Sequence, residues 1–367
     1  MPHSLTDKQV LKIAVLGAAG GIGQSFSMLL KTQLHTLLLP HSDKHLHVAM
    51  YDINKDAIVG TVADLSHIDT PVTLSHHFPA SRDDLSALKE CLADAALIVI
   101  PAGVPRKPGM TRDDLFAINA KILLQLSDGI ASFCDLSKIF VLVISNPVNS
   151  LVPVMIKRLS QHASSKGSLI ERRVFGLTQL DMVRASTFIQ QLTGFASNAT
   201  PYIPVVGGHS GDTIIPMFSQ VMFKDERLPL DMEQRKSLIH RVQYGGDEIV
   251  KAKNGAGSAT LSMAYAAFKI TRKFVDLLLG NATSLQDTLY ISLKDASGNY
   301  IAPGAQELMA LINVSYFSIP VTVSTKGVTH VDSEILNRMD DYERNTLLPV
   351  CLKNLQGNIE TGLNFVN

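Results

Sequence analysis

Short apolar runs alternate with helix-like patterns along the first half of the chain. Residues 11–16 form an apolar run that predicts a buried strand, and the periodic segment 24–34 behind it predicts a helix. Further strand-like runs follow at 46–52, 97–101 and 139–145. Because parallel neighbours need helical crossovers, this alternation predicts a doubly wound parallel sheet.

The pattern changes near residue 157, where longer helical patterns alternate with hairpin-like strands such as 290–293. We therefore expect a Rossmann-type α/β domain with a doubly wound parallel sheet at residues 10–156. An α+β substrate-binding domain is expected to follow at 157–367. In doubly wound sheets, ligands bind beyond the carboxyl ends of the strands, and the unusual residues of this sequence lie at those ends.

The composition excludes several classes of function. The 33 basic and 33 acidic side chains balance, so no global field recruits nucleic acid or an anionic membrane. Cys91, Cys134 and Cys351 are too few and too scattered for a disulfide framework or a zinc cluster, which favours a reducing compartment. The sequence shows no targeting signal and no apolar stretch of membrane-spanning length. We expect a cytoplasmic enzyme without a metal, with an organelle left open.

A glycine-rich turn joins the first strand to the helix behind it. Gly17, Gly20, Gly21 and Gly23 lie where backbone can approach a pyrophosphate and where a helix N-terminus can bind it. Asp52 ends the second strand, where a carboxylate accepts ribose hydroxyls and repels a 2′-phosphate. A structural turn and a solvated acid are the simpler explanations, but the strand, turn, helix and acid together favour an NAD site.

The loop at residues 101–114 follows the third strand and holds Arg106 and Arg112 among prolines and glycines. Such a segment suits a lid that closes over a ligand and expels water. Its arginines favour anion recognition over a solvated surface. Asn146 ends the fourth strand and can bind a substrate hydroxyl or the cofactor ribose; the alternative is a turn residue before proline.

A proton-transfer group is predicted in the second half of the chain. His209 stands between glycines after an apolar run, and Asp181 and Arg184 lie one helical turn apart upstream. A proton-coupled redox reaction on a small anion needs an imidazole, an orienting carboxylate and a guanidinium that binds a carboxylate. A buried histidine bonded to a backbone carbonyl is the alternative. Arg172 and Arg173 lack such surroundings, and we expect them at the surface.

Taken together, the motifs resemble the NAD-dependent malate dehydrogenases of the mitochondrial and bacterial type, within the lactate/malate dehydrogenase superfamily. The resemblance covers about residues 11–330. The motifs that carry it are, in chain order, VLGAAGGIGQ at 15–24, ADLSH at 63–67, IPAGVPRKPGMTR at 100–112, ISNPVNS at 144–150 and NGAGSATLSM at 254–263.

The resemblance implies roles for the residues singled out above. His209 is implied to be the catalytic acid/base and Asp181 its orienting partner. Arg184 would bind the C1 carboxylate of the substrate, Arg106 its distal carboxylate, and Arg112 its carbonyl.

The same resemblance places Asn146 at both substrate and cofactor, and Asn119 and Met263 at the cofactor. It implies reversible oxidation of (S)-malate to oxaloacetate, in which His209 takes the hydroxyl proton while NAD takes a hydride. It also implies a homodimer. A related 2-hydroxy acid dehydrogenase with another substrate range is the alternative, and a catalytically inactive NAD-binding regulator is a third reading.

The sequence departs from the family pattern at several places. Asp212 stands where this subgroup usually has an apolar residue, and Asn254 stands where it usually has alanine. Segments 34–47 and 287–303 resemble insertions, and the chain past about residue 330 resembles an extension without a counterpart.

Overall fold

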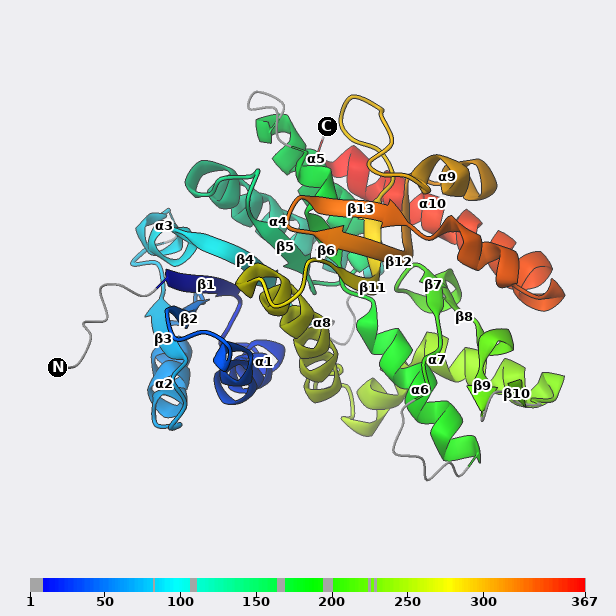
Figure 1. Cartoon of the computed structure of the whole chain (residues 1–367), viewed down its shortest axis with the longest axis horizontal. Helices are drawn as coiled ribbons and strands as arrows, with labels where there is room; N and C mark the ends of the chain where they lie inside the picture. The colour runs from blue at the N-terminus through cyan, green and yellow to red at the C-terminus, as the bar shows by residue number, and fades with distance from the viewer. Residues whose placement is uncertain are drawn as a thin grey trace.

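Parallel strands in the order β3-β2-β1-β4-β5-β6 form one part of a large sheet (Figure 1). The order reverses direction between β1 and β4, which is the switch point where doubly wound sheets bind ligands. The predicted Rossmann-type sheet is therefore confirmed. The strands are β1 (Gln9–Leu16), β2 (Lys44–Tyr51), β3 (Thr73–His77), β4 (Ala95–Ile100), β5 (Phe140–Val143) and β6 (Val174–Gly176).

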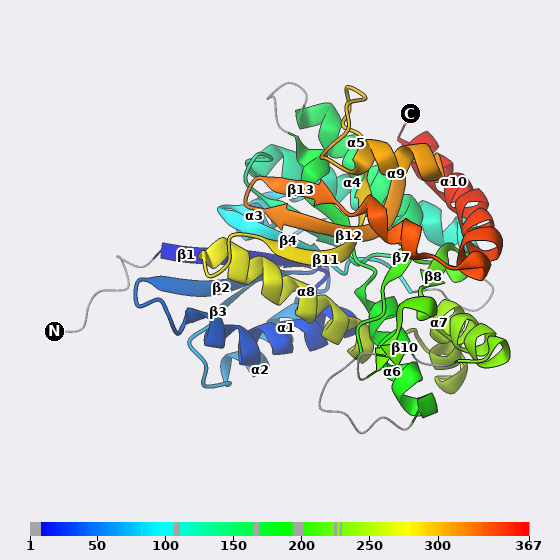
Figure 2. The same ribbon diagram turned by 45° about the vertical axis from the view of Figure 1, so that its right-hand side comes forward.

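The computed structural model describes residues 9–81, 83–105, 111–163, 169–193, 201–223, 226–227 and 230–366. Helices cover both faces of the parallel strands, α1 and α2 on one side and α3, α4 and α5 on the other (Figures 1 and 2). Strand β5 is buried along its whole length and β4 nearly so. Their continuous apolar runs thus reflect a sheet that is covered on both faces. The helices are α1 (Gly21–Gln33), α2 (Lys55–Ser66), α3 (Ser86–Leu92), α4 (Arg112–Phe133) and α5 (Val148–Ala163).

Antiparallel strands continue the same sheet beyond β6, in the order β11-β12-β7-β8, with β13 beside β12. Tyr290 pairs with Gly176 where β11 joins β6. The strands are β7 (Val205–Gly207), β8 (Ile214–Pro216), β9 (Met222–Phe223), β10 (Glu226–Arg227), β11 (Leu285–Ser292), β12 (Tyr316–Ser324) and β13 (Gly327–Val331). The helices are α6 (Gln179–Thr193), α7 (Met232–Ala252), α8 (Leu261–Leu279), α9 (Ala305–Ile312) and α10 (Leu348–Phe365). This mixture confirms the predicted α+β character of the second half.

The main hydrophobic core is shared by both halves of the chain. Phe274 of α8 packs against Phe140 of β5 and Phe175 of β6, with ring centroids 5.1 and 5.4 Å apart. A smaller cluster fills the space between α6, α7, β7 and β8. The expected domain boundary at residues 156–157 falls inside α5, and it stays a prediction.

The segment 34–47 forms part of the fold and ties the two halves together. Residues Leu34–Leu38 form a 3₁₀ turn, and the rest of the segment leads into β2. Asn281, just beyond α8, donates from Nδ2 to the carbonyl of Leu37 at 3.1 Å. Its Oδ1 lies 2.5 Å from Nε2 of His41.

Strand β11 overlaps the strand expected at 290–293 and includes the first residues of segment 287–303, with Leu289 and Tyr290 fully buried. One expectation about the second half was wrong. Arg173 is not at the surface. It is buried, donates to the carbonyls of Lys138 and Thr325, and lies over the ring of Phe140 at 4.9 Å. The sequence pattern did not indicate this burial because Arg173 stands next to another arginine, Arg172.

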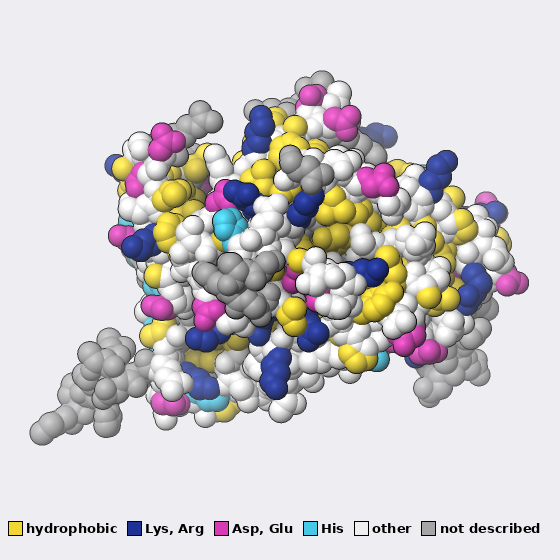
Figure 3. All heavy atoms as spheres, turned by 90° about the horizontal axis from the view of Figure 1, so that it is seen from above, with side chains coloured by type: hydrophobic (Ala, Val, Ile, Leu, Met, Phe, Trp, Pro, Cys, Tyr) yellow, Lys and Arg dark blue, Asp and Glu magenta, His cyan; other side chains and the backbone are white. Residues whose placement is uncertain are grey.

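The outer surface is mixed in charge. Figure 3 shows one face, on which Lys and Arg side chains lie interspersed with Asp and Glu. Within the described ranges, no helix combines the length and apolar character needed to span a membrane. The described side chains also include no group of three or more His, Cys, Asp or Glu arranged to hold a metal ion.

Candidate active site

The glycine-rich turn between β1 and α1 is closed tightly against its neighbours. Gly17 has a φ of +96°, and a Cβ there would lie 2.5 Å from Cα of Ala102. A Cβ on Gly23 would lie 2.3 Å from the carbonyl oxygen of Gly17. Gly20 is the N-cap of α1 and offers no side-chain acceptor, so the helix N-terminus is available to an anion. This turn fits the pyrophosphate of a dinucleotide.

Asp52 follows β2 and faces the glycine-rich turn. Its Oδ2 accepts from the backbone N–H of Ala19 at 2.9 Å, and its Oδ1 accepts from that of Asn54 at 3.0 Å. The two bonds hold the carboxylate beside the turn and leave further lone pairs free to accept hydrogen bonds from a ligand. A carboxylate fixed there suits the adenosine ribose of NAD.

Asn119 and Asn146 connect the ends of β4 and β5. Asn119 of α4 is buried, accepts from the N–H of Val104 at 2.8 Å and donates to the carbonyl of Asn146 at 2.7 Å. The side chain of Asn146 is exposed, and its Oδ1 accepts weakly from the N–H of Val148 at 3.4 Å. The arrangement leaves Asn146 open to a ligand, whereas the amide of Asn119 binds the loop backbone. The predicted cofactor role of Asn119 remains untested.

His209, Asp181 and Arg184 come together as the sequence predicted. Nδ1 of His209 lies 2.5 Å from Oδ2 of Asp181. A guanidinium nitrogen of Arg184 lies 3.7 Å from the other carboxylate oxygen. The side chains are 8%, 0% and 12% exposed for His209, Asp181 and Arg184, so the Asp181 carboxylate is shielded from water by the other groups.

Local backbone geometry explains why these side chains meet. Asp181 lies in the first turn of α6, and Arg184 follows on the next turn of the same face. β7 ends at Gly207, and His209 follows after Gly208. Gly207 has a φ of +106°, and a Cβ there would lie 2.2 Å from the carbonyl oxygen of Thr213. Only glycine permits this sharp return of the chain.

Arg184 is packed against α7 by a second glycine contact. A Cβ on Gly245 would lie 3.1 Å from Cδ and Nε of Arg184. Burial lowers the pKa of Arg184, and nearby carboxylates, above all that of Asp181, act in the opposite direction. The guanidinium stays charged because its ordinary pKa is far above neutral.

Met263 lies near the start of α8, the helix whose beginning borders the nucleotide turn. It lies in the first turn of α8 and is buried. Thr260, at the start of the same helix, has its Cγ2 3.0 Å from the position of a Cβ on Gly21. The beginning of α8 therefore borders the nucleotide turn.

The lid arginines fall outside this description. Arg106 lies outside the described residues, and Arg112 begins α4 with a side chain that is not described. Their predicted roles remain untested. Asn149 was not among the residues to which the sequence pointed, although it stands in the same motif as Asn146. Its Oδ1 accepts from the backbone N–H of His209 at 2.7 Å.

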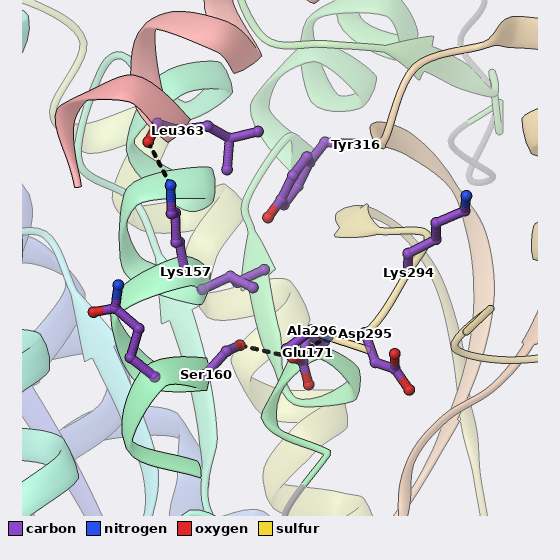
Figure 4. Close-up of a pocket in the computed structure, with 10 residues that line it drawn as sticks. Lys157, Ser160, Glu171, Lys294, Asp295, Ala296, Tyr316 and Leu363 are labelled. Carbon is purple, nitrogen blue, oxygen red and sulfur yellow. Dashed lines mark hydrogen bonds between the residues drawn. The ribbon is translucent and has the colours of Figure 1, made fainter. Parts of the chain in front are cut away.

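A cavity of about 320 Å³ lies apart from these groups, at the far end of α5 (Figure 4). Glu171 lies at its base and accepts from Oγ of Ser160 at 2.7 Å and from the N–H of Ala296 at 2.9 Å. Lys157 donates to the carbonyl of Leu363 at 3.0 Å. None of the described lining residues is a predicted site residue.

Comparisons with known proteins agree with the geometry. Residues 11–176 match the family model for the lactate/malate dehydrogenase NAD binding domain. Residues 178–366 match the model for the lactate/malate dehydrogenase alpha/beta C-terminal domain. The second match includes α10, so the expected extension past residue 330 was wrong: this segment packs as part of the family domain.

Individual relatives match over nearly the whole chain. The cytoplasmic malate dehydrogenase of Saccharomyces cerevisiae is 57% identical, covering 100% of this chain and 98% of that protein. The mitochondrial malate dehydrogenase of Schizosaccharomyces pombe is 40% identical, covering 99% and 94%. The solved structure of Cryptosporidium parvum malate dehydrogenase has a TM-score of 0.72 at 24% identity, covering 97% of this chain and 100% of that one. This last likeness concerns the fold alone.

Proposed function

The chain belongs to the lactate/malate dehydrogenase family, and we propose that it catalyses the reversible NAD-dependent oxidation of (S)-malate to oxaloacetate. NAD is the cofactor of the family's N-terminal domain, which the chain carries. The observation that carries the proposal is the contact of His209 with Asp181 beside Arg184.

His209 is the proposed acid/base. Nδ1 donates its proton to the Asp181 carboxylate, which fixes the tautomer and leaves Nε2 for the substrate. In malate oxidation Nε2 takes the proton of the C2 hydroxyl, and in oxaloacetate reduction the imidazolium returns it. The buried Asp181 carboxylate stabilises that imidazolium. NAD, when bound, supplies the hydride acceptor.

Arg184 is the proposed binding group for the C1 carboxylate. Its distance of 3.7 Å from Asp181 is longer than a hydrogen bond, so the guanidinium N–H groups remain available for a bidentate pair. Arg106 is proposed to bind the distal carboxylate, and Arg112 to polarise the carbonyl. Asn146 would bind the substrate and the cofactor ribose, because its amide stands exposed at the end of β5.

A homodimer in the cytoplasm is also proposed. The family resemblance implies the dimer, and exposed apolar side chains support it on α1 and α8, which pack together. Met28, Leu261 and Tyr265 are 51%, 74% and 49% exposed. Large exposed apolar patches mark interfaces, and Leu261 and Tyr265 lie four residues apart on one face of α8. The location follows from the relative named as cytoplasmic. Sedimentation of the purified protein tests the dimer, and microscopy of the tagged protein tests the location.

Substrate choice tests the proposed function. NADH oxidation is followed by absorbance with oxaloacetate, pyruvate and an aromatic 2-oxo acid, and we expect the highest kcat/KM with oxaloacetate. Arg106→Gln should lose most activity on oxaloacetate and gain some on pyruvate, because the cation no longer lies unpaired beside a methyl group. Lys107→Gln removes a charge from the same loop and is the matched control. An unchanged oxaloacetate-to-pyruvate ratio in Arg106→Gln refutes this role, and preference for another acid favours the alternative dehydrogenase.

A further inference from the structure

The C-terminal helix α10 reaches the loop that carries His209. It packs closely along α5, since a Cβ on Gly362 would lie 2.1 Å from the carbonyl oxygen of Ser150. Near its beginning, Sγ of Cys351 lies 3.2 Å from the carbonyl oxygen of Thr213, at the end of the His209 loop. The helix is thus held both to α5 and to the loop.

One buried amide links α5, α10 and the loop. Asn149 of α5 accepts from the backbone N–H of His209 at 2.7 Å. Its Nδ2 donates to Oγ of Ser210 at 3.0 Å, to Oγ1 of Thr213 at 3.1 Å and to Oδ1 of Asn358 at 3.0 Å. Asn358 comes from α10. The amide therefore holds both the residue that bears the imidazole and the two hydroxyls beyond it.

The chemistry of the donors fixes the orientation of both amides. A backbone N–H only donates, so Asn149 must present Oδ1 to His209 and Nδ2 to the other partners. Asn358 must then accept through its oxygen. That oxygen also accepts from Oγ of Ser210 at 3.4 Å. Oγ of Ser210 also lies 3.5 Å from Oγ1 of Thr213, so Asn358 is one of two groups that can accept from the Ser210 hydroxyl.

The loop is shaped around this amide. A Cβ on Gly208 would lie 2.7 Å from Oδ1 of Asn149 and 2.6 Å from Oγ1 of Thr213. Asn149 is itself buried, and its carbonyl accepts from the hydroxyl of Tyr290 at 3.1 Å. The loop also closes on itself, with the N–H of Ser210 donating to Oγ1 of Thr213 at 3.0 Å, so a shift of Asn149 acts on His209 through its backbone N–H.

We propose that Asn149 and Asn358 are positioning residues for the proton transfer, holding His209 in register with Asp181. The C-terminal helix thereby forms part of the active centre. The inference rests on the proposed function, because it assumes that His209 moves the proton. It assigns Asn358 a role that acts only through His209 and not through NADH or substrate binding.

Variants of Asn358 test the proposal because this residue is only half-buried and on a surface helix. Asn358→Leu keeps the shape and removes the acceptor, whereas Asn358→Asp keeps an oxygen for both donors. Gln356→Leu is the matched control, since Gln356 is exposed and its amide donates to Glu360 of its own helix. The readouts are kcat, KM for NADH and for oxaloacetate, and Tm.

We expect Asn358→Leu to lower kcat by about 10-fold to 10²-fold with both KM values within about twofold, because a misplacement of about 1 Å can cost on the order of 10²-fold. Asn358→Asp should restore kcat to within about threefold of the wild type, as a retained acceptor requires. Gln356→Leu should match the wild type. A wild-type kcat in Asn358→Leu, or a loss in Asn358→Asp equal to that in Asn358→Leu, overturns the proposal.

A double-mutant cycle separates positioning from general damage. In a His209→Asn background, Asn358→Leu should cause no further loss of kcat, because the group that it positions is gone. An equal loss in both backgrounds shows a merely structural role and overturns the inference while leaving the proposed function intact. Full turnover in His209→Asn alone refutes the proposed acid/base, and this inference with it.

Discussion

Replacing Gly23 by alanine tests the nucleotide turn most directly. The added Cβ would lie 2.3 Å from the carbonyl oxygen of Gly17 and 2.6 Å from Cα of Ala18. Non-bonded heavy atoms are most favourable at about 3.5–4.0 Å, so the turn must open by about 1 Å. Both neighbours are backbone atoms, so no flexible side chain can move aside.

The cost has two parts. Overpacking of this kind costs roughly 1–3 kcal/mol, and the better helix propensity of alanine offsets about 1 kcal/mol of that cost. We therefore expect Gly23→Ala to lower the free energy of unfolding by up to about 2 kcal/mol. Opening the turn also withdraws one backbone N–H from an anion, and a hydrogen bond to a charged group contributes about 1.5–3 kcal/mol. The Kd for NADH should rise about 10- to 100-fold.

The assay is a fluorescence titration with NADH, paired with urea unfolding of the free protein. Gly60→Ala is the matched control, because Gly60 lies within α2 and a Cβ there meets nothing within 4 Å. The control should gain up to about 1 kcal/mol of stability and keep the wild-type Kd. If Gly23→Ala binds NADH as tightly as Gly60→Ala does, the glycine-rich turn does not bind the pyrophosphate.

Further changes test the acid/base, the cofactor choice and the second half of the fold. His209→Asn should lower kcat on the order of 10²–10⁴-fold with NADH binding intact, and a variant with more than half the wild-type rate removes His209 from the mechanism. Asp52→Ser should narrow the preference for NADH over NADPH, mainly by weakening NADH; equal use of both cofactors by the unmodified protein contradicts this. Arg235 pairs with fully buried Glu343 at 2.7 Å, so Arg235→Met should destabilise the protein by roughly 3–5 kcal/mol in urea unfolding at neutral pH. The Arg235 side chain also lowers the pKa of Asp340 from its ordinary 3.8, so this pair stabilises the fold above that pH and loses its effect as pH falls below it. The acid limb of the stability curve should therefore be flatter in Arg235→Met, and an unchanged limb contradicts the assignment.

Much of the parallel sheet could be predicted because its strands are covered on both faces. Strands β4 and β5 are continuous apolar runs and β1 and β2 end in apolar runs, and the expected ranges overlap the observed ones. β3 was missed because it carries Thr-Leu-Ser-His-His and lies at the sheet edge, where burial is incomplete. An edge strand of this kind has no apolar signal for a pattern to report.

The second half shows why pattern reading fails for tertiary contacts. The pattern placed a strand at 290–293 but missed its first residues, 285–289, because they are polar in part; β11 lies between β6 and β12 and buries Leu289 and Tyr290. Arg173 was expected at the surface, but it donates to two backbone carbonyls and its guanidinium lies over the ring of Phe140. In both places, contacts with distant parts of the chain bury residues that the local sequence suggests are exposed, and buried polar groups there find hydrogen-bond partners.

The motif at residues 144–150 contains two asparagines that the fold places in different surroundings. It holds Asn146 and Asn149, two identical amides, and only the first drew attention as a site residue. The start of α5 at Val148 turns them apart: Asn146 stays exposed at the end of β5, whereas Asn149 is carried inward against the backbone of His209. The residue type determines which groups an amide can bind, but the role of Asn149 depends on His209, which lies 60 positions away in the sequence. The support of His209 is a tertiary arrangement, which is why the imidazole could be predicted from the sequence and the amides that hold it could not.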